Sequence, residues 1–278
     1  MTTVTAETVP PPAKRETIYR HSVATRITHW INVLVISLLL MSGLNIFNAH
    51  PRLYWGQAGA DFDHAWFQLG AVGERGFARI GDLSIDTTGV LGVSKSHGAV
   101  EAQGFPDWAT WPGYRDLATA RRWHFSLAWL LVFNGAAYYL FSLASGHLRR
   151  DIAPTKADLA PRNIWRSIVD HVRLKHPVGV EAKRYNILQK FAYLAVIAVL
   201  LPLMVLTGLT MSPGVDSAVP WLTDVLGGRQ SARGIHFICA NLIVLFVIVH
   251  VVEVFLAGVV NEVRSMITGR YVVPREKH

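Results

Sequence analysis

Four of the twelve histidines in this chain lie inside long apolar segments, namely His29, His124, His236 and His250. A neutral imidazole binds a transition metal through one ring nitrogen, and it also exchanges protons near neutral pH. An ionisable side chain within an apolar segment is energetically costly, so its presence indicates a functional site. The other histidines fall in expected loops and tails, where we assign them no role.

Two of these residues, His236 and His250, are 14 positions apart in one segment. At about 100° per residue, this spacing completes almost four turns of an α-helix, so both imidazoles project from the same face. At a rise of about 1.5 Å per residue, they lie roughly 21 Å apart along the helix axis. One helix therefore presents histidine at two levels.

The histidines need long helices to hold them, and the distribution of charged residues predicts four. Stretches of 18 or more residues without Asp, Glu, Lys or Arg begin at Trp30, Trp123 and Phe191. A fourth apolar stretch begins at Gly234 and is interrupted only at Glu253. Because a helix that crosses a membrane needs about 20 apolar residues, all four qualify. The predicted fold class is all-α, an integral membrane four-helix bundle.

The predicted organisation is one transmembrane domain, residues 21–270, with a flexible tail at 1–20 and a second tail at 271–278. The four helices are expected at 24–48, 121–147, 186–212 and 232–260. The loop 49–120 joins the first two helices and the loop 148–185 joins the second and third. The first loop holds 11 of the 22 glycines and many aromatic residues. It is predicted to be a cap on the membrane surface, a docking platform for a partner, or both.

Lys and Arg residues predict the orientation of the bundle. Of the 27, 18 lie before the apolar stretch of the first helix, between the apolar stretches of the second and third, or after that of the fourth. The positive-inside rule places these segments and both termini in the cytoplasm, with a bacterial inner membrane as the expected location. The segment Arg162–Leu174 is predicted to be a short amphipathic helix on the inner interface with membrane lipid. The basic residues behind the net charge of +8 are thus distributed according to the membrane orientation, and they do not indicate a nucleic-acid partner.

This orientation gives each histidine a depth. His124 and His236 lie at the outer level, whereas His29 and His250 lie at the inner level. One imidazole from each of two helices, at each depth, suits the two axial positions of a haem iron. A zinc or di-iron centre normally gathers three or more ligands in one place, often carboxylates. We therefore expect two b-type haems, the outer one on His124 and His236 and the inner one on His29 and His250.

Three arginines each precede a proposed ligand by three residues: Arg26, Arg121 and Arg233. One turn away on the same face, a guanidinium group can pair with a haem propionate. The alternative is an arginine that flanks a helix end and extends its charge to the water. Three glycines in the helices are candidates for letting a flat cofactor approach the backbone: Gly43, Gly135 and Gly208.

These residues resemble the di-haem cytochrome b membrane subunits of bacterial respiratory complexes, such as the b-type cytochrome of nickel-iron hydrogenases and the gamma subunit of formate dehydrogenase. The matching segments are 26–30, 122–124 and 185–193, together with the His236 and His250 pair. The segments 54–56, 63–66 and 220–221 are most similar to the thiosulfate reductase cytochrome b branch. The resemblance covers nearly all of the chain beyond the N-terminal tail.

The resemblance implies an electron-transfer subunit of a membrane oxidoreductase that links a quinone pool to an outer-face molybdopterin or iron–sulfur partner. It places a quinone site at the inner end of the third helix, where Asn186 is the matching residue and Gln189 and Tyr193 are further candidates. Their alternative role is to cap that helix. Glu253 is expected either to relay protons to the quinone or to pair with an inner-side cation such as Arg26.

Three other functions remain open from the sequence. The first is a self-sufficient quinol-oxidising cytochrome b. The second, of a different class, is a transporter with protonatable histidines along its path. The third is a membrane metalloenzyme that uses non-haem iron or zinc. The sequence also leaves open the direction of electron flow and the formation of a homo-oligomer.

Overall fold

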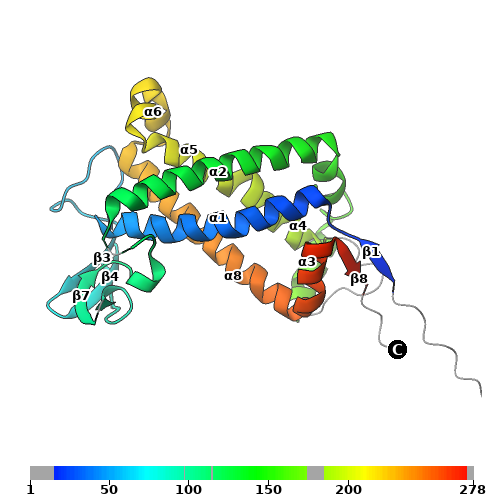
Figure 1. Ribbon diagram of the computed structural model, residues 1–278, viewed down its shortest axis with the longest axis horizontal. Helices are drawn as coiled ribbons and strands as arrows, with labels where there is room; N and C mark the ends of the chain where they lie inside the picture. Colours follow the sequence, from blue (N-terminus) through cyan, green and yellow to red (C-terminus); the bar gives the residue numbers. More distant parts are fainter. Residues whose placement is uncertain (1–15, 97, 114, 174–184, 274–278) are drawn as a thin grey trace, which may run out of the picture.

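The computed structural model describes residues 16–96, 98–113, 115–173 and 185–273. Within them, four helical segments are long and apolar enough to span a membrane, and they run along the long axis of the molecule (Figure 1). These segments are α1 (Val23–Asn48), α2 (Leu117–Ala144), the stretch Ile187–Thr210 and α8 (Arg229–Thr268). The predicted membrane helical bundle is confirmed.

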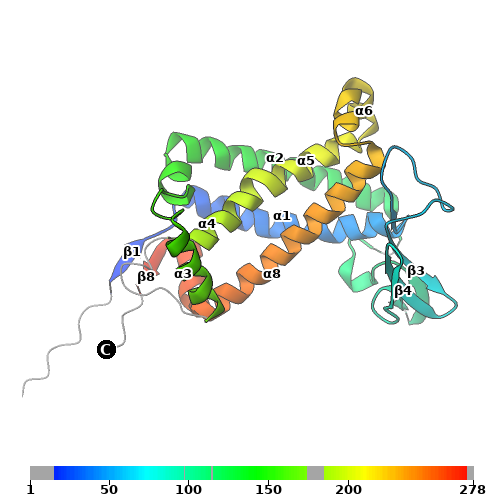
Figure 2. The ribbon, with the colours of Figure 1, turned by 180° about the vertical axis from the view of Figure 1, so that it is seen from behind.

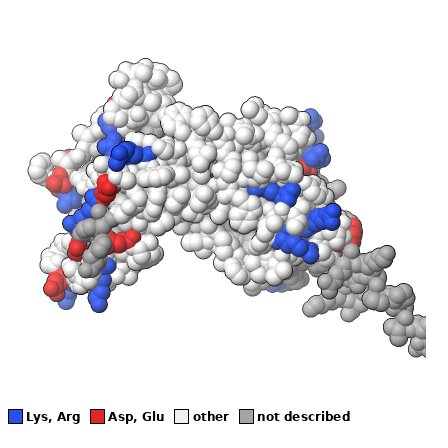
Figure 3. Space-filling model, in the orientation of Figure 1, with Lys and Arg blue, Asp and Glu red and all other residues white. Residues whose placement is uncertain are grey.

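Charged residues gather toward the two ends of the bundle and leave an uncharged band between them (Figure 3). Many large apolar side chains of the spans are exposed, among them Leu34 of α1, Phe133 and Leu140 of α2, and Phe255 of α8. Such exposure suits contact with lipid tails, because apolar surface is stable in hydrocarbon. Below, the outer end is the end that carries strands β2 to β7, and the inner end is the one that carries β1 and β8.

The third span is built from three consecutive helical pieces. These are α4 (Ile187–Leu194), the π-helical stretch η4 (Ala195–Leu200) and α5 (Leu201–Thr210). Proline has no backbone N–H, so Pro202 cannot donate the usual helical hydrogen bond, and the π-helical stretch ends immediately before the proline's helix begins. In Figure 2, which views the molecule from behind, α4, α5 and α8 cross in front of α1 and α2.

Helix α8 has a kink near its inner end. Gly258 has a φ of +107°, a conformation that glycine adopts without steric cost, and the helix then continues to Thr268. The predicted end at residue 260 therefore lies close to the kink rather than at the end of the helix. Gly269 closes the helix in the left-handed region, with φ of +79°.

The two ends of the described chain pair at the inner end. Strands β1 (Thr17–Tyr19) and β8 (Arg270–Val272) form an antiparallel ribbon (Figure 1). Both strands overlap the segments expected as tails, so the ordered domain extends further than the predicted 21–270. The amphipathic helix α3 (Pro161–Val172) also lies at this end, close to its expected bounds, after the π-helical stretch η2 (Leu148–Ile152).

The outer end contains β-structure that the sequence reading did not predict. A four-stranded antiparallel sheet has the order β2–β3–β4–β5, and a separate hairpin pairs β6 with β7. The strands are β2 (Arg52–Leu53), β3 (Phe67–Val72), β4 (Arg75–Ile80), β5 (Leu83–Asp86), β6 (Gly92–Ser96) and β7 (Ala99–Gln103). The short helices η1 (Asp107–Ala109), α6 (Pro213–Ala218) and α7 (Pro220–Val225) complete this end.

A core of aromatic and aliphatic side chains joins the sheet to the bundle. Phe47 at the end of α1, with Leu53 and Leu69, is packed against Phe67 and Phe237. The ring of Phe47 stacks on that of Phe237 with centroids 4.9 Å apart. Since Phe237 directly follows one of the candidate ligands in α8, this core ties the outer sheet to the outer histidine level.

The outer loop caps the start of α8, because the N-cap residue, Gly228, has no side chain that could do so. The carbonyl of Gly56 accepts from the backbone N–H groups of Gln230 and Ser231 at 3.0 and 3.2 Å. These bonds satisfy two of the donors that a helix leaves free at its first turn. A Cβ on Gly228 would lie 2.5 Å from the backbone of Gly56, so only glycine allows this close approach. The outer loop therefore fixes where α8 begins.

Candidate haem-binding histidine pairs

The structure brings the four histidines together in two pairs. At the outer level, the rings of His124 and His236 have centroids 6.4 Å apart. At the inner level, the rings of His29 and His250 also have centroids 6.4 Å apart. Each pair takes one ring from α8 and one from another helix. This is the pairing by depth that the spacing predicted.

The separation within each pair suits two axial ligands on one metal. Two metal–nitrogen bonds of about 2 Å each, with about 1 Å from each ring centre to its nitrogen, place two axial imidazole centres roughly 6 Å apart. Among the described residues, no group of three or more His, Cys, Asp or Glu side chains is arranged to hold a metal ion. The donor set thus fits a haem iron, whose porphyrin supplies the remaining ligands.

Hydroxyl groups orient both outer rings. Ser42 Oγ lies 3.0 Å from His124 Nδ1 and also donates to the Leu38 carbonyl at 2.7 Å. Thr207 Oγ1 lies 2.9 Å from His236 Nδ1 and donates to the Leu203 carbonyl. Since each hydroxyl proton is directed to a carbonyl, the hydroxyl oxygen accepts from the ring Nδ1–H. The other nitrogen, Nε2, is then unprotonated and available to a metal.

A glycine follows each of these hydroxyl residues, and the histidine ring packs close to that glycine. A Cβ on Gly43 would lie 3.3 Å from His124 Cε1, and one on Gly208 would lie 3.6 Å from His236 Cε1. A Cβ on Gly135 would meet no atom within 4 Å. Two of the three predicted glycines therefore contact ligand candidates, and Gly135 does not. The repeated pattern of hydroxyl residue and glycine, in α1 and in the third span, is a signal that the sequence reading missed.

The inner pair has aromatic neighbours in place of hydroxyls. Phe246 stacks on His250 with centroids 5.8 Å apart and planes at 8°. Trp30 contacts His29 edge to face at 5.4 Å, and its indole N–H donates to the Met266 carbonyl at 3.0 Å. His29 Nδ1 is buried and has no hydrogen-bond partner among the described residues. The inner rings are thus packed in place more than hydrogen-bonded.

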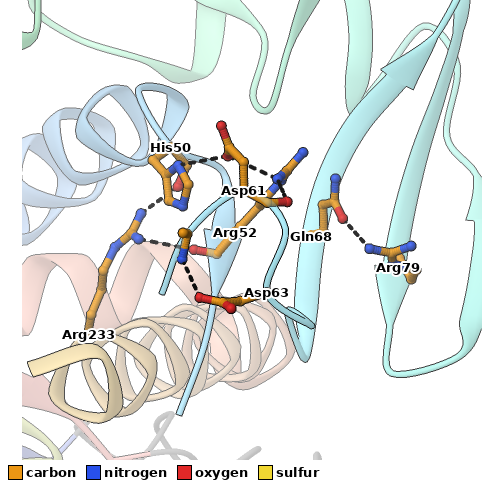
Figure 4. A network of polar contacts seen from close by, with 8 residues as sticks. His50, Arg52, Asp61, Asp63, Gln68, Arg79 and Arg233 are labelled. Carbon is orange, nitrogen blue, oxygen red and sulfur yellow. Dashed lines mark hydrogen bonds and ion pairs between the residues drawn. The ribbon is translucent and has the colours of Figure 1, made fainter. Parts of the chain in front are cut away.

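The three candidate propionate arginines contact other groups. Arg233 donates to the carbonyls of His50 and Arg52 in the outer loop, and Figure 4 shows these bonds beside Asp61. Arg26 donates to the Ile267 carbonyl. Arg121 lies over the Phe125 ring at 5.7 Å. A propionate would have to share Arg26 and Arg233 with backbone carbonyls, so the propionate role stays a prediction.

Two of the candidate quinone residues cap a helix. Asn186 accepts from the Gln189 N–H at 2.9 Å, and the Gln189 side chain accepts from the Asn186 N–H at 3.2 Å. This reciprocal capping box begins α4 and is the alternative role expected for both. Tyr193 instead lies against the rings of Tyr185 and Phe246, at 5.3 and 6.4 Å.

Glu253 has a partner that the sequence reading did not name. Its carboxylate contacts Nε2 of His171, a residue of α3 that was given no role. The alternative pairing with Arg26 is not present among the described residues, where the Arg26 guanidinium donates to the Ile267 carbonyl near the end of α8. Nothing in the local sequence joins positions 171 and 253; only the packing of α3 onto the bundle brings them together.

The fold and the two histidine pairs define a membrane-embedded cytochrome of the b type. Residues 20–269 match the family model of prokaryotic cytochrome b561, and the chain belongs to this family of membrane electron-transfer subunits. The chain is similar to a protein of Azospira oryzae named as protein-methionine-sulfoxide reductase subunit YedZ1. The two are 30% identical over 233 residues, which cover 83% of this chain and 87% of that protein. No solved structure matches the chain significantly.

Proposed function

We propose that this protein passes electrons across the membrane through two b-type haems, between a quinone pool at the inner end and an oxidoreductase at the outer end. The observation that carries the proposal is that histidines pair at two levels of one bundle. In each pair the ring centroids are 6.4 Å apart. A single haem would leave one pair without a purpose in a costly apolar environment.

Each residue of the two pairs has a role in this proposal. His124 and His236 hold the outer haem, and His29 and His250 hold the inner one. A bound haem supplies one-electron redox chemistry at its iron. Ser42 and Thr207 fix the orientation of the outer rings through Nδ1. The lipid and the packed helices exclude water from both levels.

The proposed partner is an oxidoreductase subunit that docks at the outer end. Support comes from the relative, whose name makes it a subunit of a reductase, and from the folded outer loop beside the outer histidines. A molybdopterin or iron–sulfur enzyme is the expected class. The excess of Lys and Arg at the inner end supports a bacterial inner membrane location with both termini in the cytoplasm.

The proposed quinone site lies at the inner end, near Tyr193 and Glu253. Tyr193 contacts Phe246, which stacks on His250, so this position is close to the inner histidine pair. The side chains of Asn186 and Gln189 are used by their capping box, so we give them a structural role at the edge of that site.

A haem assay on purified protein tests the proposal. We expect two haem b groups per chain from the pyridine haemochrome spectrum, and reduction of both by a quinol such as decylubiquinol. A colourless protein would favour the transporter, and metal without porphyrin would favour a non-haem enzyme. Turnover of a small acceptor with no outer-face subunit co-purified would favour the self-sufficient cytochrome.

A further inference from the structure

The surface helix α3 and the span α8 are joined by one acid–base contact, between His171 and Glu253. Helix α3 lies at the inner end, with exposed Trp165 and Val172 that suit the membrane interface. The side chains of His171 and Glu253 are 41% and 27% exposed, so the contact is partly open at the surface of the chain. Through α8 it continues into the bundle.

Glu253 lies one helical turn after His250 on α8. The titratable groups nearby are His171 from α3, Tyr193 from α4, and His250 and Glu262 on its own helix. The Tyr193 ring lies against the rings of Tyr185 and Phe246, and Phe246 in turn stacks on His250.

Other polar contacts at the inner end have structural roles. Lys190 is buried and donates to Asp158 at 2.8 Å, which fixes the loop after η2 to α4. Arg20 lies 3.7 Å from Glu262 and holds the terminal ribbon. Lysine and arginine keep their charge near neutral pH. The pair of His171 and Glu253 differs, because an imidazole beside a carboxylate is a pairing that acid–base chemistry commonly uses.

We propose that His171 and Glu253 form the proton path between the quinone site and the cytoplasmic water. This inference rests on the proposed function, since it assigns the protons of the same quinone reaction. Quinol oxidation breaks two O–H bonds and releases two electrons and two protons. Haems held by the two histidine pairs would accept these electrons one at a time. Each proton passes to a carboxylate oxygen of Glu253, then to His171 and to water, and quinone reduction runs the same path in reverse.

The rival role is a plain anchor that holds α3 on the bundle. A substitution of His171 by lysine separates the two, because lysine keeps a cation beside Glu253 but holds its proton far above neutral pH. The matched control is Asp170→Asn, which changes the neighbouring α3 residue that pairs with Arg166 at 3.7 Å. Together with Glu253→Gln, these variants test proton transfer apart from attachment.

The experiment measures haem reduction by decylubiquinol in stopped flow, between about pH 6 and 8, the range in which imidazole titrates. We expect Glu253→Gln and His171→Lys to slow reduction about tenfold or more and to flatten its pH profile. Haem content and reduction by dithionite should match the wild type in both variants. The equilibrium binding of decylubiquinone, followed by tryptophan quenching, should match it in His171→Lys. Asp170→Asn should stay within about twofold, as a surface substitution away from the path.

Two results would overturn the inference. If both variants are reduced at the wild-type rate, the two residues carry no protons. If His171→Lys is fully active while Glu253→Gln is slow, the contact with His171 only attaches α3 to the bundle. If the wild type itself binds no decylubiquinone and is not reduced by the quinol, the quinone part of the proposed function fails first and takes this inference with it.

Discussion

The outer and inner histidine pairs have the same separation but different surroundings. Each outer ring lies within hydrogen-bond distance of a hydroxyl, from Ser42 or Thr207, and a glycine lies beside each ring. The inner rings pack against Phe246 and Trp30, and a titratable pair lies one turn away. These surroundings fit the proposed roles, in which the outer level holds a cofactor in one orientation and the inner level lies beside the proposed quinone site.

The largest expected effect separates the two levels by removing one cofactor at a time. Replacing His124 or His236 by alanine should abolish the outer haem and leave the inner one, since each iron needs both axial ligands. Replacing His29 or His250 should do the reverse. The pyridine haemochrome and the reduced-minus-oxidised spectrum measure the outcome. Two haems that survive any single replacement would contradict the pairing.

A strong effect confined to the outer level is expected from Gly43→Val. Its Cβ would lie 3.3 Å from His124 Cε1, and the added methyl groups would push the ring from its position. We expect most of the outer haem to be lost and the inner haem to remain. Gly135→Val is the control, because the Cβ there meets no atom within 4 Å. Equal haem loss in both variants would point to general disturbance of the helices.

At the inner end, the buried side chain of His21 predicts acid sensitivity. Burial, followed by the nearby Arg20, lowers the pKa of His21 from 6.5 to about 4. The unfolded chain therefore binds more protons between these values, so stability falls as the pH drops from about 6.5 to 4. The loss is at most about 3 kcal/mol. Thermal melting in detergent across this pH range measures it, and His21→Gln should weaken the dependence.

A smaller effect should shift only the outer redox potential. An acceptor on Nδ1–H makes the imidazole a stronger donor and favours the oxidised iron. Ser42→Ala or Thr207→Val should therefore raise the outer potential. A bond worth about 1 kcal/mol corresponds to roughly 40 mV for one electron. A redox titration followed at the haem bands would detect this, and a shift of the inner potential instead would refute the assignment.

The sequence by itself determined the four spans and the two levels at which the histidines lie along them. The orientation read from the Lys and Arg residues stays a prediction. Hydropathy and helical periodicity are local properties, so His236 and His250 on one face follow from their spacing alone. The start of α8 at Arg229 and its kink at Gly258 were harder to place. The start depends on the contact with Gly56 in the outer loop. The kink depends on a backbone conformation that glycine can adopt but that the sequence around it does not predict.

Only the tertiary structure decided the surroundings of the histidines. Ser42 meets His124 across 82 positions of the chain, and Glu253 meets His171 across two different helices. The strands of the outer loop likewise depend on pairing between segments, and their local signal of glycine turns and alternating residues is weak. Such contacts arise from helix and strand packing, which joins residues that no local pattern relates.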